Sequence, residues 1–180
     1  VEHSVERMRQ LMMQLREGPT PPGTVCGVQL TNVINCVRES KMKQGRTIEM
    51  TISEDLATRG HAERLERVIS HLVQNALDAT DEDGKVWVSL KRHGDRAVVE
   101  VGDTGCGMTE EFIRDRLFKP FQSTKQAGMG IGAYESAQYI REMGGELQVA
   151  SQEDSGTRVT MILPLFDAGK RSDLHETERA

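Results

Sequence analysis

The sequence has few of the features that build disulfide frameworks, membrane spans or nucleic-acid surfaces. Its cysteines, Cys26, Cys36 and Cys106, are odd in number and lack CxxC spacing, which argues against a disulfide framework and a zinc site and favours a reducing cytoplasm. No apolar run approaches the roughly 20 residues that cross a bilayer, and no signal-peptide pattern opens the chain. The net charge is −5, and no basic stripe alternates with aromatic residues, so we expect no nucleic-acid partner.

The remaining composition is that of a soluble globular protein, with 37% hydrophobic and 28% charged residues in a chain of 180. Apolar residues from Val5 to Leu15 recur at helical spacing, and the run GPTPPG at 18–23 breaks regular structure. We therefore expect a separate helix at 1–17, a linker at 18–23, one compact domain at 24–166 and a disordered tail at 167–180.

Apolar periodicity within the compact domain predicts both helices and strands. The expected helices cover about 32–42, 62–80, 110–116 and 134–143. The expected strands cover 26–30, 47–52, 86–92, 97–102, 146–151 and 157–164, with a hairpin turn at Gly94-Asp95. Because helices and strands do not alternate regularly, we predict an α+β fold with a mixed β-sheet covered by helices on one face.

A first candidate site lies on the helix expected at 62–80. His71, Asn75 and Asp78 are spaced i, i+4 and i+7, so they share one face of that helix. An amide oxygen is a suitable ligand for Mg²⁺, which makes Asn75 the candidate metal ligand. The alternative is that His71 and Asn75 are ordinary exposed polar residues of a helix.

A second candidate site is the glycine loop 102–108, which follows the strand expected at 97–102. A carboxylate only accepts hydrogen bonds, so Asp103 could bind the exocyclic amine of adenine, while Gly105 and Gly107 let the backbone approach the ring. Thr157 opens the last strand and offers a hydroxyl that could support Asp103. The alternative is a tight turn with an aspartate cap.

A third candidate site is a glycine-rich segment that runs into the helix expected at 134–143. Glycines before a helix expose N–H groups at its positive end, where phosphate oxygens can bind. The candidate phosphate-binding residues are Ser123, Thr124, Lys125, Gly128, Met129, Gly130, Ile131 and Gly132. A GxGxG segment can also be a plain hinge; the lack of a preceding strand and of GxxxxGK[ST] argues against Rossmann and P-loop folds.

Taken in order, the segments 71–80, 102–108, 118–121 and 128–132 resemble the motifs of the GHKL (Bergerat) ATP-binding fold of sensor histidine kinases, DNA gyrase, Hsp90 chaperones and MutL. The resemblance covers about 24–164 and implies a five-stranded mixed sheet under three helices, with a lid between the two glycine segments. Hydrolases of this superfamily carry a glutamate where His71 stands. The Phe118-to-Phe121 segment, and a helix at 5–15 that resembles the end of a dimerisation helix, favour the histidine kinase branch.

The resemblance implies the catalytic domain of a two-component sensor histidine kinase, which binds Mg²⁺ and ATP and transfers the γ-phosphate to a histidine on a dimerisation domain preceding Val1. It implies that His71 orients water or the metal. The expected partners are ATP, that phosphoacceptor domain, a response-regulator receiver domain and a second copy in a full-length homodimer. We expect a cytoplasmic location, with membrane anchorage of the full-length protein left open.

Two departures from the family pattern affect the phosphate contacts. Asp78 stands where histidine kinases often carry a lysine or arginine that meets the γ-phosphate, and Met129 differs from the common lid pattern. Charge neutralisation would then fall to Mg²⁺ and Lys125. Two alternative functions are a serine kinase of the anti-sigma-factor type and a degenerate nucleotide-binding module that only binds a partner.

Overall fold

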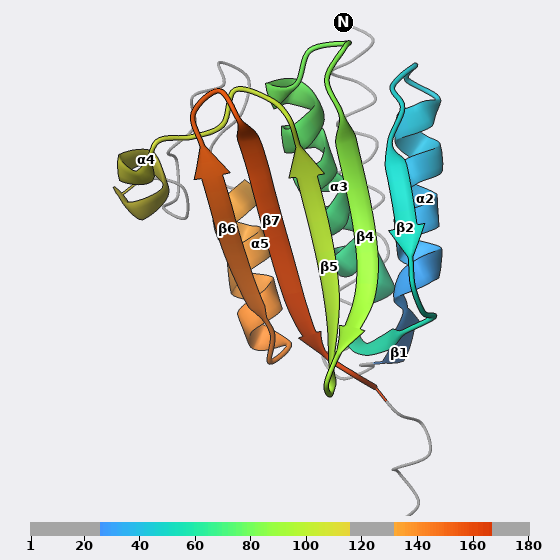
Figure 1. Ribbon diagram of the computed structural model, residues 1–180. Helices are drawn as coiled ribbons and strands as arrows, with labels where there is room; N and C mark the ends of the chain where they lie inside the picture. Colours follow the sequence, from blue (N-terminus) through green and yellow to red (C-terminus); the bar gives the residue numbers. More distant parts are fainter. Residues whose placement is uncertain (1–25, 116–131, 167–180) are drawn as a thin grey trace, which may run out of the picture.

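The computed structural model describes residues 26–115 and 132–166, which form a mixed five-stranded sheet with helices on one face (Figure 1). The sheet order is β2-β4-β5-β7-β6; β2 pairs parallel with β4, and the other neighbours pair antiparallel. Its strands are β2 (Glu49–Ile52), β4 (Val86–His93), β5 (Arg96–Asp103), β6 (Glu146–Gln152) and β7 (Gly156–Pro164). The predicted α+β class is confirmed.

Three helices cover the sheet in Figure 1: α2 (Leu30–Met42), α3 (Ala62–Ala79) and α5 (Gly132–Glu142). The short helix α4 (Glu110–Asp115) contacts β6. A separate antiparallel pair, β1 (Cys26–Gln29) and β3 (Ala57–Gly60), lies outside the main sheet. No helix in the described ranges is long and apolar enough to cross a membrane.

The central helix α3 is held in place by its apolar face. The buried side chains of this face are Leu65, Val68, Ile69, Leu72, Val73, Ala76 and Leu77. They share one core with inward-facing residues of β4 and β5, and full burial of each large aliphatic side chain contributes about 1.5–3 kcal/mol. This packing fixes the rotation of α3, so the face with His71, Asn75 and Asp78 points away from the core.

The predicted elements are found within two or three residues of their expected ends, and the hairpin at Gly94-Asp95 joins β4 to β5. The sequence pattern did not predict β3. This strand has only four residues and pairs with β1, some 30 residues earlier in the chain. The predictions for 1–17, 18–23, 118–125, 128–131 and 167–180 lie outside the described residues.

The open face of the sheet carries a polar cluster around the single tryptophan. The indole of Trp87 donates from Nε1 to Oε1 of Glu100 at 3.2 Å, and Nε of Arg158 lies 3.5 Å from the same oxygen. The ring packs directly on Gly102, where a Cβ would lie 2.2 Å from ring atoms. Glycine at 102 is therefore required by the tryptophan on this face, and Asp103 next to it points to the opposite side.

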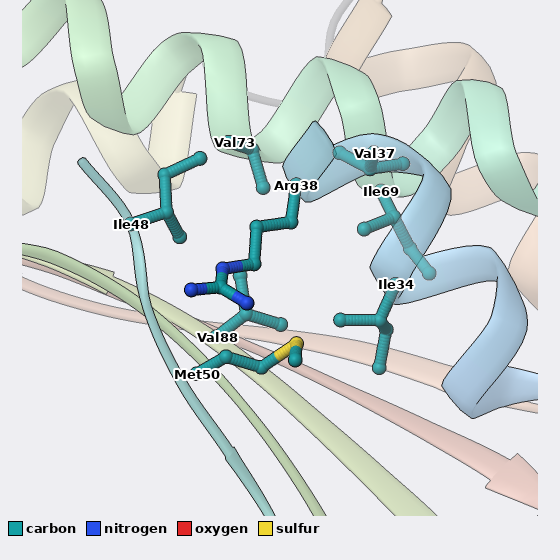
Figure 2. A pocket seen from close by; sticks show the side chains of 8 residues that line it. All are labelled: Ile34, Val37, Arg38, Ile48, Met50, Ile69, Val73 and Val88. Carbon is teal, nitrogen blue, oxygen red and sulfur yellow. The ribbon is translucent and has the colours of Figure 1, made fainter. Parts of the chain in front are cut away.

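A small hollow lies between α2, α3 and the β2 side of the sheet (Figure 2). It is lined by Ile34, Val37, Arg38, Ile48, Met50, Ile69, Val73 and Val88. The Nε atom of Arg38 is buried here and has no hydrogen-bond partner among the described residues. The lining contains no residue of the glycine loop 102–108, so this hollow is separate from the candidate site.

Candidate functional site

The glycine loop after β5 is fastened to the C-terminal end of α3. The N–H of Cys106 donates to the carbonyl of Ala79 at 3.0 Å, which satisfies a carbonyl that the helix end leaves without an internal partner. A Cβ at Gly105 would lie 2.1 Å from this same carbonyl oxygen. Glycine is therefore required at 105 because the loop packs closely against the end of α3.

Asp103 is the last residue of β5, and it is buried with only 5% of its surface exposed. The N–H of Gly105 donates to its Oδ1 at 2.8 Å, and the backbone of Thr157 and the hydroxyl of Thr80 also bond the carboxylate. The Thr80 hydroxyl also donates to the Ala76 carbonyl at 2.7 Å, and of the three bonds to Asp103 its bond lowers the pKa least.

Burial raises the pKa of Asp103 above its ordinary value of 3.8, and the bonds from Gly105, Thr157 and Thr80 oppose that shift. The side chain is thus a partly desolvated carboxyl that the fold holds in one orientation. A buried acceptor of this kind strongly favours a ligand that brings a hydrogen-bond donor.

The ends of β6 and β7 support the glycine loop from the other side. Ser151 Oγ accepts from the N–H of Met108 at 2.8 Å, donates to the carbonyl of Gly156 at 3.0 Å and lies 2.7 Å from the hydroxyl of Thr157. Thr157 thus serves Asp103 through its backbone, while its hydroxyl contacts Ser151.

Two glycines of this region have backbone conformations that L side chains rarely adopt. Gly107 has φ +67° and Gly156 has φ +111°. A Cβ at Gly107 would lie 2.0 Å from the carbonyl oxygen of Gln152, and one at Gly156 would lie 2.0 Å from that of Asp103. Both positions therefore require glycine for conformation and for space.

His71 and Asn75 lie one above the other on α3 and are both half-buried. The Nδ2 of Asn75 is 3.1 Å from Nε2 of His71, and an amide N–H can donate here only if His71 is the neutral tautomer with an unprotonated Nε2. With that tautomer of His71, the amide oxygen of Asn75 faces away from the imidazole. Asn75 is one helical turn before Ala79, so the candidate metal ligand and the glycine loop meet at the same end of α3.

The structure describes only the last residue of the predicted phosphate segment. Gly132 is the first residue of α5, as the glycine-before-helix pattern predicts. The helix is anchored by Tyr139, whose hydroxyl accepts from the N–H of His61 at 3.0 Å, and the guanidinium of Arg64 lies 4.1 Å from the Tyr139 ring centroid. Ser123, Thr124, Lys125, Gly128, Met129, Gly130 and Ile131 lie outside the described residues.

The predicted site residues did not include Thr80 and Ser151. Thr80 directly follows the last residue of α3, and its hydroxyl bonds the Ala76 carbonyl. In the sequence, a threonine at this position cannot be distinguished from an ordinary helix-capping residue. Ser151 faces inward in the alternation of β6, and an inward polar residue near a strand end was the available clue.

Residues 60–167 match the family described as Histidine kinase-, DNA gyrase B-, and HSP90-like ATPase, so the chain belongs to this ATP-binding family. Its fold resembles the catalytic domain of histidine kinase ThkA, with TM-score 0.69 and 26% identity over 79% of this chain and 96% of that one. A mycobacterial sensor histidine kinase, MprB, shares the fold with TM-score 0.71 and 23% identity, over 79% and 98% of the two chains.

Within the family, this chain contains the ATP-binding catalytic domain of the sensor histidine kinase type. Sensor protein DegM of Bacillus sp. (strain B21-2) is 31% identical over 124 residues, which cover 68% of this chain and 33% of DegM. Sporulation kinase C of Bacillus subtilis is 32% identical over 106 residues, 59% of this chain and 24% of that kinase. The chain thus spans a third or less of these relatives.

Proposed function

We propose that this domain works in a two-component sensor histidine kinase, where it binds Mg²⁺-ATP and presents the γ-phosphate to a histidine on a dimerisation domain of the full-length protein. The observation that supports this most is Asp103, a buried carboxylate at a strand end that the glycine loop and β7 hold in place. It marks a site for a donor-bearing ligand beside the end of α3.

The donor set at Asp103 fits adenine. An ionised carboxylate has about four acceptor positions and no donor, and the protein supplies up to three donors, so about one position is left for a ligand N–H. Adenine carries an exocyclic amine, whereas guanine carries a carbonyl at the same ring position and would be repelled. Gly105 and Gly107 have no side chains to block the approach of a flat ring.

The residues present also fit a magnesium ion that is held mainly by phosphates. The described ranges contain no group of three His, Cys, Asp or Glu residues that could hold a metal alone. Mg²⁺ commonly keeps water and phosphate oxygens and takes only one or two protein ligands, so the amide oxygen of Asn75 is a sufficient protein contribution.

Bound Mg²⁺-ATP would supply a transferable phosphoryl group, and positioning and charge neutralisation are what such transfer needs. We assign to Asn75 the metal ligand, and to His71 the orientation of the metal or water, through the amide it bonds. We assign the phosphate contacts to Ser123, Thr124, Lys125, Gly128, Met129, Gly130, Ile131 and Gly132, and the support of Asp103 to Thr157.

The organisation of the full-length protein follows from this role. Residues 1–17 would be the end of a dimerisation helix, 18–23 a linker, 24–166 the catalytic domain and 167–180 a disordered tail. The partners would be the dimerisation and phosphoacceptor domain, a response-regulator receiver domain and a second copy of the kinase, in the cytoplasm.

Calorimetry with Mg²⁺-ATP tests the binding site. We expect binding by the wild-type chain and its loss in Asp103→Ala; absence of wild-type binding, or binding unchanged by the substitution, would refute the proposal and favour a degenerate interaction module. In a full-length protein that carries the proposed dimerisation domain, we expect acid-labile phosphate on the kinase itself. Acid-stable phosphoserine on another protein would instead identify a serine kinase.

A further inference from the structure

A buried lysine links α2 to the functional face of α3. Lys41, in the last turn of α2, is only 9% exposed, and its ammonium donates to Oε1 of Gln74 at 2.9 Å. The amide nitrogen of Gln74 in turn donates to Oδ1 of Asp78 at 2.8 Å. An ammonium can only donate and a carboxylate can only accept, so the amide of Gln74 can bridge them in one orientation alone.

Asp78 is an unfavourable residue for its position. A negative charge near the C-terminus of a helix opposes the helix dipole, and α3 has no basic residue of its own in its last turn. Two cations from the preceding segment compensate: Lys41 acts through Gln74, and Arg46 donates from Nη2 to the carbonyl of Thr80 at 3.0 Å. The end of α3 thus depends on charges supplied by α2 and the turn after it.

The position of Asp78 also matters for the proposed ligand. On a helix surface, residue 78 is a neighbour of Gln74 at i−4 and of Asn75 at i−3. A carboxylate directed toward Asn75 would face the triphosphate that this asparagine is proposed to hold through Mg²⁺. The bond to Gln74 directs it to the side of α3 that faces α2.

We propose that Lys41 and Gln74 are positioning residues for nucleotide binding, which hold the carboxylate of Asp78 on the α2 side of α3 and so keep its charge away from the triphosphate. This inference rests on the proposed function. It explains how a site with an aspartate three residues after the metal-binding asparagine can still accept a highly negative ligand: the charge of Asp78 is turned aside and compensated by Lys41.

The test compares affinities for Mg²⁺-ATP and for adenosine, which has no phosphate, in the same variants. Lys41→Met keeps the length of the buried stem and removes the ammonium. We expect it to weaken Mg²⁺-ATP binding by about three- to tenfold, the size that one partly screened charge produces, and to leave adenosine binding unchanged. Lys43→Met, an exposed lysine two residues on, is the matched control and should bind both ligands like the wild type.

Rescue by Asp78→Asn separates electrostatics from packing. Added to Lys41→Met, it should restore Mg²⁺-ATP binding, and alone it should stay within about twofold of the wild type. If Lys41→Met does not fold, Gln74→Glu serves instead: it keeps an acceptor for Lys41 but repels Asp78, and should show the same phosphate-dependent loss and the same rescue.

Three results would overturn the inference: equal losses for ATP and adenosine, no rescue by Asp78→Asn, or loss of ATP binding in Asp78→Asn alone, which would make Asp78 a cation ligand. If the wild-type chain binds Mg²⁺-ATP and Lys41→Met binds it equally well, this inference is overturned and the proposed function still stands. A wild-type chain that does not bind Mg²⁺-ATP would overturn both.

Discussion

Replacing Asp103 by asparagine is the sharpest test of how this domain selects its nucleotide. The substitution keeps the size of the side chain, but it exchanges one acceptor oxygen for an NH₂ group that only donates. Because the N–H of Gly105 needs an acceptor at 2.8 Å, we expect the asparagine oxygen to stay with Gly105. The position that would accept the adenine amine then carries a donor.

The expected loss follows from the kind of hydrogen bond that is removed. A bond to a charged, buried acceptor contributes about 1.5–3 kcal/mol, so Asp103→Asn should weaken Mg²⁺-ATP binding by about 10- to 150-fold. The same NH₂ group can donate to the carbonyl of guanine, so the preference for ATP over GTP should shrink or reverse. Calorimetric titration with Mg²⁺-ATP and Mg²⁺-GTP measures both effects.

Glu100→Gln is the matched control for this experiment. It makes the same acid-to-amide change on the same strand, but its side chain lies on the open face beside Trp87 and Arg158. We expect nucleotide binding like the wild type. If Asp103→Asn binds ATP with wild-type affinity and keeps the preference over GTP, Asp103 does not read adenine and the reasoning fails.

Three further predictions concern the support of this carboxylate. Gly105→Ala places a methyl group against the carbonyl of Ala79, and we expect about 2–4 kcal/mol of destabilisation with weaker ATP binding. Gly45→Ala is the control for destabilisation alone: a Cβ there meets open space, but the φ of +83° strains any L side chain, so this variant should lower stability and leave ATP affinity unchanged. Equal ATP affinities in the two variants would contradict this. Ser151→Ala leaves the N–H of Met108 without its acceptor and should lower the free energy of unfolding, measured by chemical denaturation, by about 1–3 kcal/mol. A decrease below about 0.5 kcal/mol, the size expected of a neutral surface substitution, would refute this role. Because burial raises the pKa of Asp103, the folded state favours the protonated carboxyl. The stability of the wild type relative to Asp103→Asn should therefore be greatest below pH 3.8 and fall as the pH rises through the folded-state pKa. Denaturation curves with the opposite trend would show that the hydrogen bonds to the carboxylate outweigh its burial.

Local sequence patterns specify the helices and strands of this domain. The apolar stripe of α3 determined which face of that helix is buried, and so placed His71 and Asn75 together on the other face. Strand-like alternation followed by glycines placed Asp103 at a strand end. These features follow from residues that are close along the chain, where periodicity of 3.6 or 2 is sufficient information.

How those elements meet depends on contacts between segments that are distant in the sequence. The parallel pairing of β2 with β4, the pairing of β1 with β3, and the contact of the glycine loop with Ala79 join segments that are tens of residues apart. The bridge from Lys41 through Gln74 to Asp78 likewise spans two helices. Such contacts depend on which surfaces the packed core brings together, and no local pattern of residues contains that information.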